Sequence, residues 1–390
     1  MDEIYIKSIS SSEMAKKLAE IGFDKCYIEV GKNKYQYKIF KIHNLTPPAA
    51  NILKQTALSV GTDCAVNKEV ITCNIEKSDC ILSGNISQLK QISEKLTRQP
   101  FGLKKLSQLI NEQLENSLFP IQIRNKTFDW EKEKYLMGIL NITPDSFSDG
   151  GKYQNIDKAI QHAQQLIKDG ADIIDIGGES TRPFSLPIDS VDEQKRILPV
   201  IKELRKLNKD IVISVDTRNA DTAQKVIEHG ADIINDVSLG EYDKNMLEFV
   251  AEAGVPYVLT HTKGTPENMQ NNPQYKNVVD DVYKDLQKKI LFLNELGFSK
   301  KKLIVDIGLG FGKTVEHNFE LIRNLDDFKS LGCPLLVGHS RKSFLKEINS
   351  DIETATQVLS LYLLSTGANI LRVHNVRENL IPKNLAIKLT

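Results

Sequence analysis

Short apolar segments in the last two thirds of this 390-residue chain contain Asp and Asn residues that could bind a polar ring. Asp216, Asn235 and Asp306 lie in ISVD, IIND and LIVD, where their side chains could pair with the ring N–H and amino groups of a ligand. Each could instead cap the helix that follows, which is a common role for Asp and Asn. The recurrence of these residue types favours a site for a heterocycle with an amino-pyrimidinone edge.

A basic set accompanies the acidic one and predicts an anionic ligand. It comprises Arg182, Lys342, Arg372 and His374, and no acidic residue in the same loops obviously balances it. Arg372 and His374 are two residues apart, so on an extended strand they face the same side. Phosphate or carboxylate groups would neutralise such a set, and two adjacent donors could bind one diphosphate.

The glycine-rich run from Gly308 to Thr314 does not fit a standard nucleotide-binding loop. A P-loop would need glycine where the chain has Ile307, and a dinucleotide fingerprint would need glycine where it has Lys313. We expect these glycines to let the backbone pass close to a flat ligand, with Phe311 offering an aromatic face.

The run from Asn141 to Gly151 combines small, polar and flexible residues and is typical of a mobile lid. Asn141 supplies a neutral oxygen, which suits a Mg²⁺ ion that is held mainly by a diphosphate and water. Magnesium is therefore the expected cofactor, with Asn141 as the candidate metal ligand.

The elements that must position these residues are short apolar segments that alternate with stretches of helical period from about Tyr135 onward. Three short repeats, Gly170–Asp175, Gly230–Asn235 and Gly367–Arg372, each run from a helix end into a strand. Eight strand–helix units predict an α/β fold of the (β/α)₈ TIM barrel type, with the working residues at the C-terminal ends of the strands. The expected strands are Leu136–Asn141, Ile173–Ile176, Ile211–Asp216, Ile233–Asp236, Pro256–Thr260, Leu303–Asp306, Pro334–Gly338 and Ile370–Val373.

Residues 1–118 predict a small α+β N-terminal domain whose function the sequence does not reveal, and residues 119–390 predict the catalytic barrel. A hairpin within Phe119–Trp130 is expected to plug the bottom of the barrel. In the N-terminal domain the expected extended segments are Tyr27–Val30 and Tyr35–Ile42, and the expected helices are Ser12–Ile21, Pro48–Val60 and Ile86–Leu96.

Charge and cysteine content exclude several classes of partner and site. Lys+Arg and Asp+Glu number 51 each, which argues against nucleic acid or a membrane surface as a partner. The sequence shows neither a signal-peptide pattern nor an apolar run long enough to cross a bilayer, so a cytoplasmic protein is expected. The five cysteines show no zinc-ligand spacing and are expected to be reduced thiols, most of them buried.

Seven motifs in order resemble those of the dihydropteroate synthases, across roughly residues 135–385. The motifs are MGILNITPDSFSDGG (137–151), ADIIDIGGESTRP (171–183), SVDTR (214–218), IINDV (233–237), VDIGLGFGKT (305–314), VGHSRKS (337–343) and RVHNV (372–376). The resemblance implies a transferase of folate biosynthesis that condenses 6-hydroxymethyl-7,8-dihydropterin diphosphate with p-aminobenzoate, giving 7,8-dihydropteroate and diphosphate. It also implies a sulfonamide target that commonly forms homodimers.

The resemblance also implies roles for individual residues. The catalytic residues would be Lys342, Arg372 and His374. The pterin diphosphate would contact Thr181, Asp216, Asn235, Asp306, Lys342, Arg372 and His374. The p-aminobenzoate pocket would comprise Thr181, Arg182, Pro183, Phe311 and Ser340. Asp145 and Phe147 in the first loop and Asp175 in the second strand would support the site.

Four positions depart from the family pattern, namely Thr262, Ile307, Leu309 and His339, and they leave sulfonamide sensitivity open. Two other functions compete with the synthase. A methyltetrahydrofolate:corrinoid methyltransferase would not need the Arg372–His374 pair or the Ser-Arg-Lys loop. A barrel that binds pterin without turnover, and acts as a partner protein through the N-terminal domain, would not need an intact site.

Overall fold

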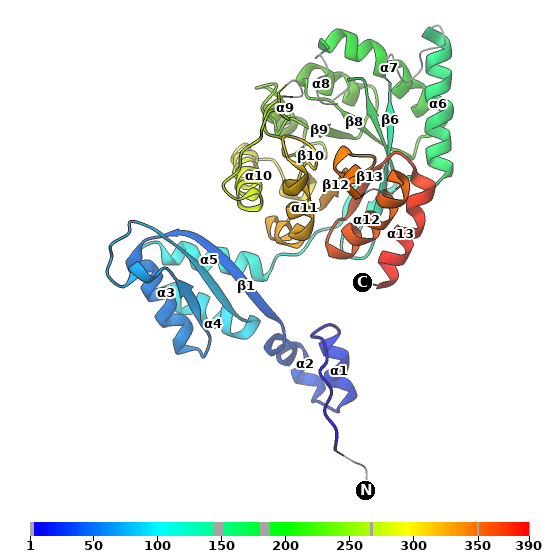
Figure 1. Cartoon of the computed structure of the whole chain (residues 1–390). Helices are drawn as coiled ribbons and strands as arrows, with labels where there is room; N and C mark the ends of the chain where they lie inside the picture. Colours follow the sequence, from blue (N-terminus) through cyan, green and yellow to red (C-terminus); the bar gives the residue numbers. More distant parts are fainter. Residues whose placement is uncertain (1–3, 143–151, 180–187, 266–267, 349–350, 390) are drawn as a thin grey trace. The chain divides into compact units, whose positions relative to one another are not determined.

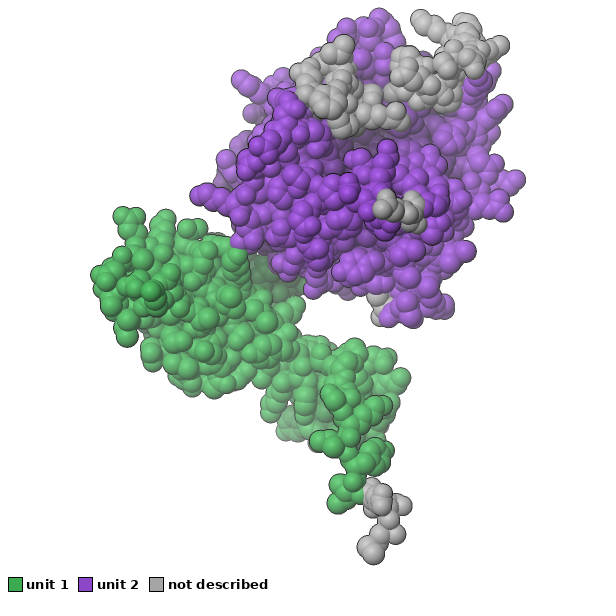
Figure 2. All heavy atoms as spheres, in the orientation of Figure 1, with its two compact units in different colours: residues 1–116 green, residues 117–390 purple. Residues whose placement is uncertain are grey.

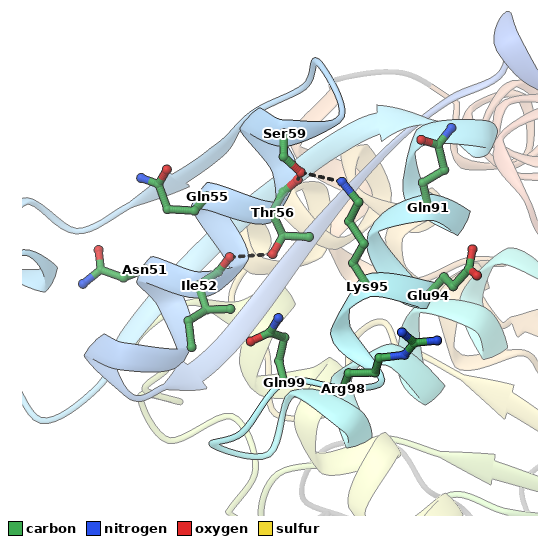
Figure 3. A pocket seen from close by; sticks show the side chains of 10 residues that line it. All are labelled: Asn51, Ile52, Gln55, Thr56, Ser59, Gln91, Glu94, Lys95, Arg98 and Gln99. Atoms are coloured by element: carbon green, nitrogen blue, oxygen red, sulfur yellow. Dashed lines mark hydrogen bonds between the residues drawn. The ribbon is translucent and has the colours of Figure 1, made fainter.

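The computed structural model describes residues 4–142, 152–179, 188–265, 268–348 and 351–389, and it divides into two compact units. Unit 1 comprises residues 1–116 and unit 2 comprises residues 117–390 (Figure 2). Each unit encloses its own hydrophobic core, so each is described separately.

Unit 2 is a closed barrel of eight parallel strands inside a ring of helices (Figure 1). The strands are β6 (Tyr135–Asn141), β7 (Ile173–Gly177), β8 (Val212–Asp216), β9 (Ile233–Asp236), β10 (Tyr257–Thr260), β11 (Leu303–Asp306), β12 (Leu335–Val337) and β13 (Ile370–Val373). The barrel closes where β13 pairs with β6. The predicted TIM barrel is confirmed, and every expected strand is present with its ends within one residue of the prediction.

The outer helices bury their apolar faces against the outside of the strands, and this layer forms the main core. The helices are α6 (Lys152–Lys168), α7 (Ser190–Leu207), α8 (Ala220–Glu228), α9 (Met246–Ala253), α10 (Val278–Glu295), α11 (Val315–Arg323), α12 (Ile352–Thr366) and α13 (Val376–Leu389). Short 3₁₀ turns lie at Lys300–Lys302, Leu325–Leu331 and Ser343–Ile348. Asp189, Asn277 and Asp351 begin α7, α10 and α12, and each side chain accepts a backbone N–H of the first turn.

The predicted hairpin is present as β4 (Ile121–Ile123) and β5 (Lys126–Phe128), and it packs against the N-terminal end of the barrel. Phe128, Trp130 and Tyr135 pack ring against ring with centroids 4.7–5.4 Å apart. Their cluster includes one buried side chain from each barrel strand, namely Met137, Ile173, Val212, Ile233, Val258, Ile304, Leu336 and Ile370. The hairpin therefore seals this end with apolar side chains.

The polar third residue of each short repeat holds this plug in place. Asp232 pairs with Arg124 of the hairpin (Nε to Oδ1, 2.5 Å) and with Arg205 of α7 (2.8 Å), and it accepts the N–H of Ile213 (2.9 Å). Asp172 forms an ion pair with Lys126 of the hairpin. Asn369 donates to the carbonyl of Trp130 (2.7 Å). The repeat thus links three barrel strands to one plug.

Unit 1 is the expected small α+β domain. An antiparallel sheet of order β1-β3-β2 contains β1 (Tyr37–Leu45), β2 (Cys64–Val66) and β3 (Ser78–Asn85). Its helices are α1 (Met14–Glu20), α2 (Ile28–Gly31), α3 (Pro47–Ser59), α4 (Ile86–Leu96) and α5 (Leu103–Leu114), with 3₁₀ turns at Lys25–Tyr27, Lys32–Lys34 and Lys68–Val70. The core lies between the sheet and α3, α4 and α5.

One prediction in unit 1 is wrong, because Tyr27–Val30 is helical and not extended. The Asp24 side chain accepts the N–H of Cys26 (2.9 Å) and starts a 3₁₀ turn that runs into α2. Tyr27 and Val30 are largely exposed, so neither is held in a sheet by burial. The β-propensity of these residues is therefore overridden by a local cap.

All five cysteines are free thiols, and three of them are buried: Cys64, Cys80 and Cys333. Among the described residues, no helix is both long and apolar enough to span a bilayer.

We predict that Asp232→Ala destabilises the barrel by about 3 kcal/mol, because it leaves two arginines and a strand N–H without their acceptor in a buried setting. Urea denaturation followed by tryptophan fluorescence measures the change, since Trp130 is the one tryptophan and lies in the plug. Asp326→Ala is the control. It breaks an exposed pair with Lys329 and should change the free energy of unfolding by less than about 0.5 kcal/mol. Equal effects would contradict the anchoring role of Asp232.

Candidate active site at the mouth of the barrel

A buried charge network crosses the C-terminal end of the barrel, opposite the plug. Arg372 on β13 pairs with Asp175 on β7 (Nε to Oδ2, 2.6 Å) and with Asp216 on β8 (2.8 Å). Asn235 on β9 donates to the same oxygen of Asp175 (3.1 Å). The guanidinium thus joins three strands, and Asn235 adds β9 through Asp175. No acid in the same loops was expected to balance Arg372, and its partners come from strands instead. The balancing carboxylates lie on strands distant in sequence.

Two acids at the mouth, Asp216 and Asp306, have pKa values raised by burial. Burial raises the pKa of Asp216 above its ordinary value of 3.8, and nearby Asp175 adds to the rise against the opposing charge of Arg372. Burial likewise raises the pKa of Asp306, whose Oδ1 accepts the N–H of Gly308 (2.8 Å). Within the described part of the chain, buried oxygens of Asp175 and Asn235 lack a hydrogen-bond partner. The site therefore retains capacity for a polar ligand.

Lys342 lies over the Phe311 ring, with Nζ 4.1 Å from the ring centroid, and donates to the carbonyl of Leu309. Burial lowers its pKa to about 8, while Asp306 opposes the change. The structure therefore brings together the predicted lysine and the predicted aromatic face. A cation over a ring gains about 1 kcal/mol or more where water is excluded.

Ser340 and His374 also meet, with Ser340 Oγ 3.1 Å from His374 Nδ1. The neighbouring His339 points elsewhere. Its Nε2 lies 2.8 Å from Ser360 Oγ on α12, and burial lowers its pKa to about 4. His339 is thus a neutral packing residue in the layer between barrel and helices, and its departure from the family pattern concerns packing.

Two glycines of the 308–314 loop, Gly308 and Gly312, pack against the backbone of a neighbouring loop. Gly308 and Gly312 have positive φ angles of 65° and 61°. A Cβ atom on Gly308 would lie 1.8 Å from the carbonyl oxygen of His261, and one on Gly312 would lie 2.2 Å from that of Lys263. Close packing against the loop after β10 therefore requires glycine at both positions.

Asn141 ends β6, and its Oδ1 faces the adjacent end of β7, since it would lie 3.4 Å from a Cβ on Gly177. Within the described ranges, no group of three His, Cys, Asp or Glu side chains could hold a metal ion. A single amide oxygen suits an ion whose other ligands come from substrate and water. Asn141 therefore fits one ligand of such an ion, and the residues that the structure describes form no complete metal cage by themselves.

Five expected site residues lie outside the described residues: Asp145, Phe147, Thr181, Arg182 and Pro183. The first two follow β6 and the others follow β7.

Sequence reasoning missed a second buried ion pair at the mouth. Arg218 donates to both oxygens of Glu179 (2.9 and 2.7 Å), and its guanidinium stacks 3.8 Å from the Tyr242 ring centroid. Glu179 also accepts the N–H of Ile188 (3.2 Å). Glu179 lies in the motif GGES and Arg218 in the motif SVDTR. The two residues come together only because β7 and β8 are neighbours in the barrel.

The fold and this polar mouth define a β/α-barrel enzyme with a site for a polar ring. The family model described as "Pterin binding enzyme" matches residues 137–374. A dihydropteroate synthase of Clostridium beijerinckii is 39% identical over 264 residues, which cover 66% of this chain and 95% of the relative. The chain therefore belongs to the dihydropteroate synthase family of pterin-binding enzymes.

Two further comparisons bear on the two units. A probable bifunctional folylpolyglutamate synthase/dihydropteroate synthase of Haloferax volcanii is 36% identical over 353 residues, covering 87% of this chain and 42% of the relative. The chain thus spans less than half of that protein, and the match reaches beyond the barrel into unit 1. A Yersinia pestis dihydropteroate synthase in complex with a sulfonamide drug matches with a TM-score of 0.64 and 37% identity, covering 70% of this chain and 99% of that one.

We predict that Gly308→Ala destabilises the barrel by about 3 kcal/mol, because the new methyl group would overlap the His261 carbonyl and force one loop away. Gly297→Ala is the matched control. It has a positive φ of 82° but nothing within 4 Å, so only backbone strain of about 1 kcal/mol is expected. Chemical denaturation of both variants gives the two values, and similar values would refute the steric explanation.

Proposed function

We propose that this chain is a dihydropteroate synthase, which condenses 6-hydroxymethyl-7,8-dihydropterin diphosphate with p-aminobenzoate in folate biosynthesis. The observation that carries the proposal is the placement of Arg372 across Asp175 and Asp216, with Lys342 in the loop after β12 and His374 directly after β13. An acidic and amide-lined floor suits an amino-pyrimidinone ring, and the basic residues beside it suit a diphosphate. The family membership supports the same reaction.

In this proposal Asp216, Asn235 and Asp306 bind the N–H and amino groups of the pterin ring, together with Thr181. Lys342 and Arg372 lie against the ring, and Arg372 and His374 hold the diphosphate. The C–O bond to diphosphate breaks and its electron pair leaves with the anion, giving a methylene cation stabilised by the ring. Basic residues stabilise the departing charge, because they are already oriented in a buried setting.

The second substrate then attacks from a pocket that we assign to Thr181, Arg182, Pro183, Phe311 and Ser340. The lone pair of the aryl amine forms the new C–N bond to the methylene carbon, and the nitrogen loses one proton. An aryl amine is unprotonated near neutral pH, so no strong general base is required. A sulfonamide resembles p-aminobenzoate in shape and would compete for this pocket. We assign the supporting roles to Asp145, Phe147 and Asp175.

Magnesium fits the leaving-group side of the site. When bound with the diphosphate, Mg²⁺ would offset the negative charge that develops on the departing oxygens. Asn141 would supply one neutral oxygen from the end of β6. Omission of Mg²⁺ should therefore reduce turnover and weaken diphosphate binding more than binding of the pterin alone.

We assign catalysis to the barrel and place the protein in the cytoplasm as a homodimer. Free thiols in all five cysteines favour a reducing compartment. An exposed apolar stripe on each of two adjacent helices favours self-association. The stripes comprise Val358 and Tyr362 on α12, and Ile381, Leu385 and Leu389 on α13. Light scattering of the whole chain tests the oligomeric state.

We predict that Arg372→Ala lowers kcat by about 10²–10³-fold or more, because it removes a donor from the departing diphosphate and leaves two buried carboxylates without a cation. The assay incubates the purified chain with dihydropterin diphosphate, p-aminobenzoate and Mg²⁺, and measures dihydropteroate and diphosphate. Arg323→Ala removes an exposed arginine of α11 and should leave turnover unchanged.

Two results would overturn the assignments. Near-normal turnover of Arg372→Ala would remove the proposed diphosphate site. Stoichiometric pterin binding by the unaltered chain without product would favour the partner-protein alternative over the synthase.

We predict that kcat/KM for the pterin diphosphate decreases as pH rises through about 8. Burial lowers the pKa of Lys342 to about 8, so Lys342 carries its charge below that pH and loses it above. Lys342→Arg keeps the charge throughout and should remove this decrease even if its maximal rate is lower. A pH–rate profile of both proteins checks the prediction, and a wild-type profile that stays flat to about pH 9.5 would contradict it.

A further inference from the structure

A second lysine lies fully enclosed beside the candidate active site. Lys313 is 2% exposed, and its Nζ contacts three acceptors. These are His261 Nδ1 (3.0 Å), the carbonyl of His261 (3.4 Å) and the carbonyl of Phe311 (2.9 Å). An ammonium group has three N–H donors, so these three acceptors match it in number. Burial lowers the pKa of Lys313, while Asp306 opposes the change.

The histidine in this cluster is oriented from both sides. His261 is 1% exposed, and its Nε2 lies 3.4 Å from Asp285 Oδ2 on α10. With Nδ1 accepting from Lys313, the neutral ring must carry its proton on Nε2, which faces the carboxylate. Lys313, His261 and Asp285 therefore link the loop after β11, the residue that follows β10 and the middle of α10.

The link leads to residues assigned to substrate binding. Lys313 holds the carbonyl of Phe311, and the Phe311 ring supports Lys342 at 4.1 Å. Loss of the Lys313 side-chain nitrogen would leave three buried acceptors without this donor, a cost that a shift of the loop after β11 would relieve. Phe311 would then lose its fixed position, and the Phe311 ring would no longer support Lys342 from below.

We infer that Lys313 is a positioning residue: held by His261, it fixes the carbonyl of Phe311 and so sets the geometry of the p-aminobenzoate pocket. The inference rests on the proposed function for the substrate, but the Lys313–His261–Asp285 link stands on the geometry alone. A misplacement of about 1 Å at a reacting group reduces rates by about 100-fold.

The test compares Lys313→Met with Lys263→Met in the whole chain. Lys313→Met should raise the KM for p-aminobenzoate at least tenfold, and kcat/KM should fall by about 100-fold. The dissociation constant of the pterin diphosphate, measured by calorimetry, should rise less than the KM for p-aminobenzoate does, because Lys342 keeps its hydrogen bond to the carbonyl of Leu309. Lys263→Met removes an exposed cation from the adjoining loop and should change none of these values.

A second measurement does not depend on turnover. In ¹⁵N NMR spectra the unaltered chain should show His261 with its proton on Nε2, and Lys313→Met should change that tautomer signal. His261→Asn offers an amide oxygen near the position of Nδ1 and should retain tighter p-aminobenzoate binding than His261→Leu, which offers none.

The outcomes separate the two proposals. An unaltered chain without turnover would refute the proposed function, and the NMR comparison would still decide the role of Lys313. An unchanged KM for p-aminobenzoate together with an unchanged His261 signal in Lys313→Met would overturn the inference. If Lys313→Met does not fold, equal p-aminobenzoate binding by His261→Asn and His261→Leu would overturn it.

Discussion

The guanidinium of Arg372 is the interaction on which the mouth of the barrel depends. It pairs with two buried carboxylates, and its charge opposes the rise that burial causes in the pKa of one of them, Asp216. Buried ions recover the free energy lost on leaving water only when their geometry is fixed. Asp175, Asp216 and Arg372 lie on strands, not on loops, and the closed barrel holds those strands in one register. A diphosphate that competes for Arg372 would change the charge seen by both acids, so ring binding and leaving-group binding are coupled through one side chain.

The opposite end of the barrel provides the rigidity that such a network needs. There the polar residues of the short repeat bind the plug, and an apolar side chain from each strand packs in the interior of the barrel. Asp172 and Asp232 stabilise the fold, whereas Asp175 and Asn235, three residues further along each strand, face the site. Each repeat therefore joins a residue that anchors the plug to one that lines the candidate site, with two buried residues between them. A shift of register at the plug would misplace the acids at the mouth.

Much of this arrangement could be predicted from sequence, for a physical reason. Parallel strands buried on both faces are short apolar runs, so their number and ends were evident, and polar residues at those ends indicated the site. Pairings across the barrel were not evident, because Arg372 reaches past β6 to Asp175, and Glu179 meets Arg218 only after β7 pairs with β8. The helical turn at Tyr27–Val30 was missed because a cap from Asp24 overrode local propensity. Sequence patterns therefore predict which residues are buried better than they predict which side chains are in contact.

The loop after β11 explains why departures from the family pattern can coexist with an intact site. Ile307 and Leu309 are both fully buried in the core, so their side chains serve packing. The contacts made toward the mouth come from main-chain atoms: the carbonyl of Leu309 accepts Lys342, and that of Phe311 accepts Lys313. A different apolar side chain at 307 or 309 preserves those carbonyls, whereas any side chain at 308 or 312 would strike the neighbouring loop. Backbone geometry therefore constrains this segment more tightly than side-chain identity does, and the two lysines depend on it together.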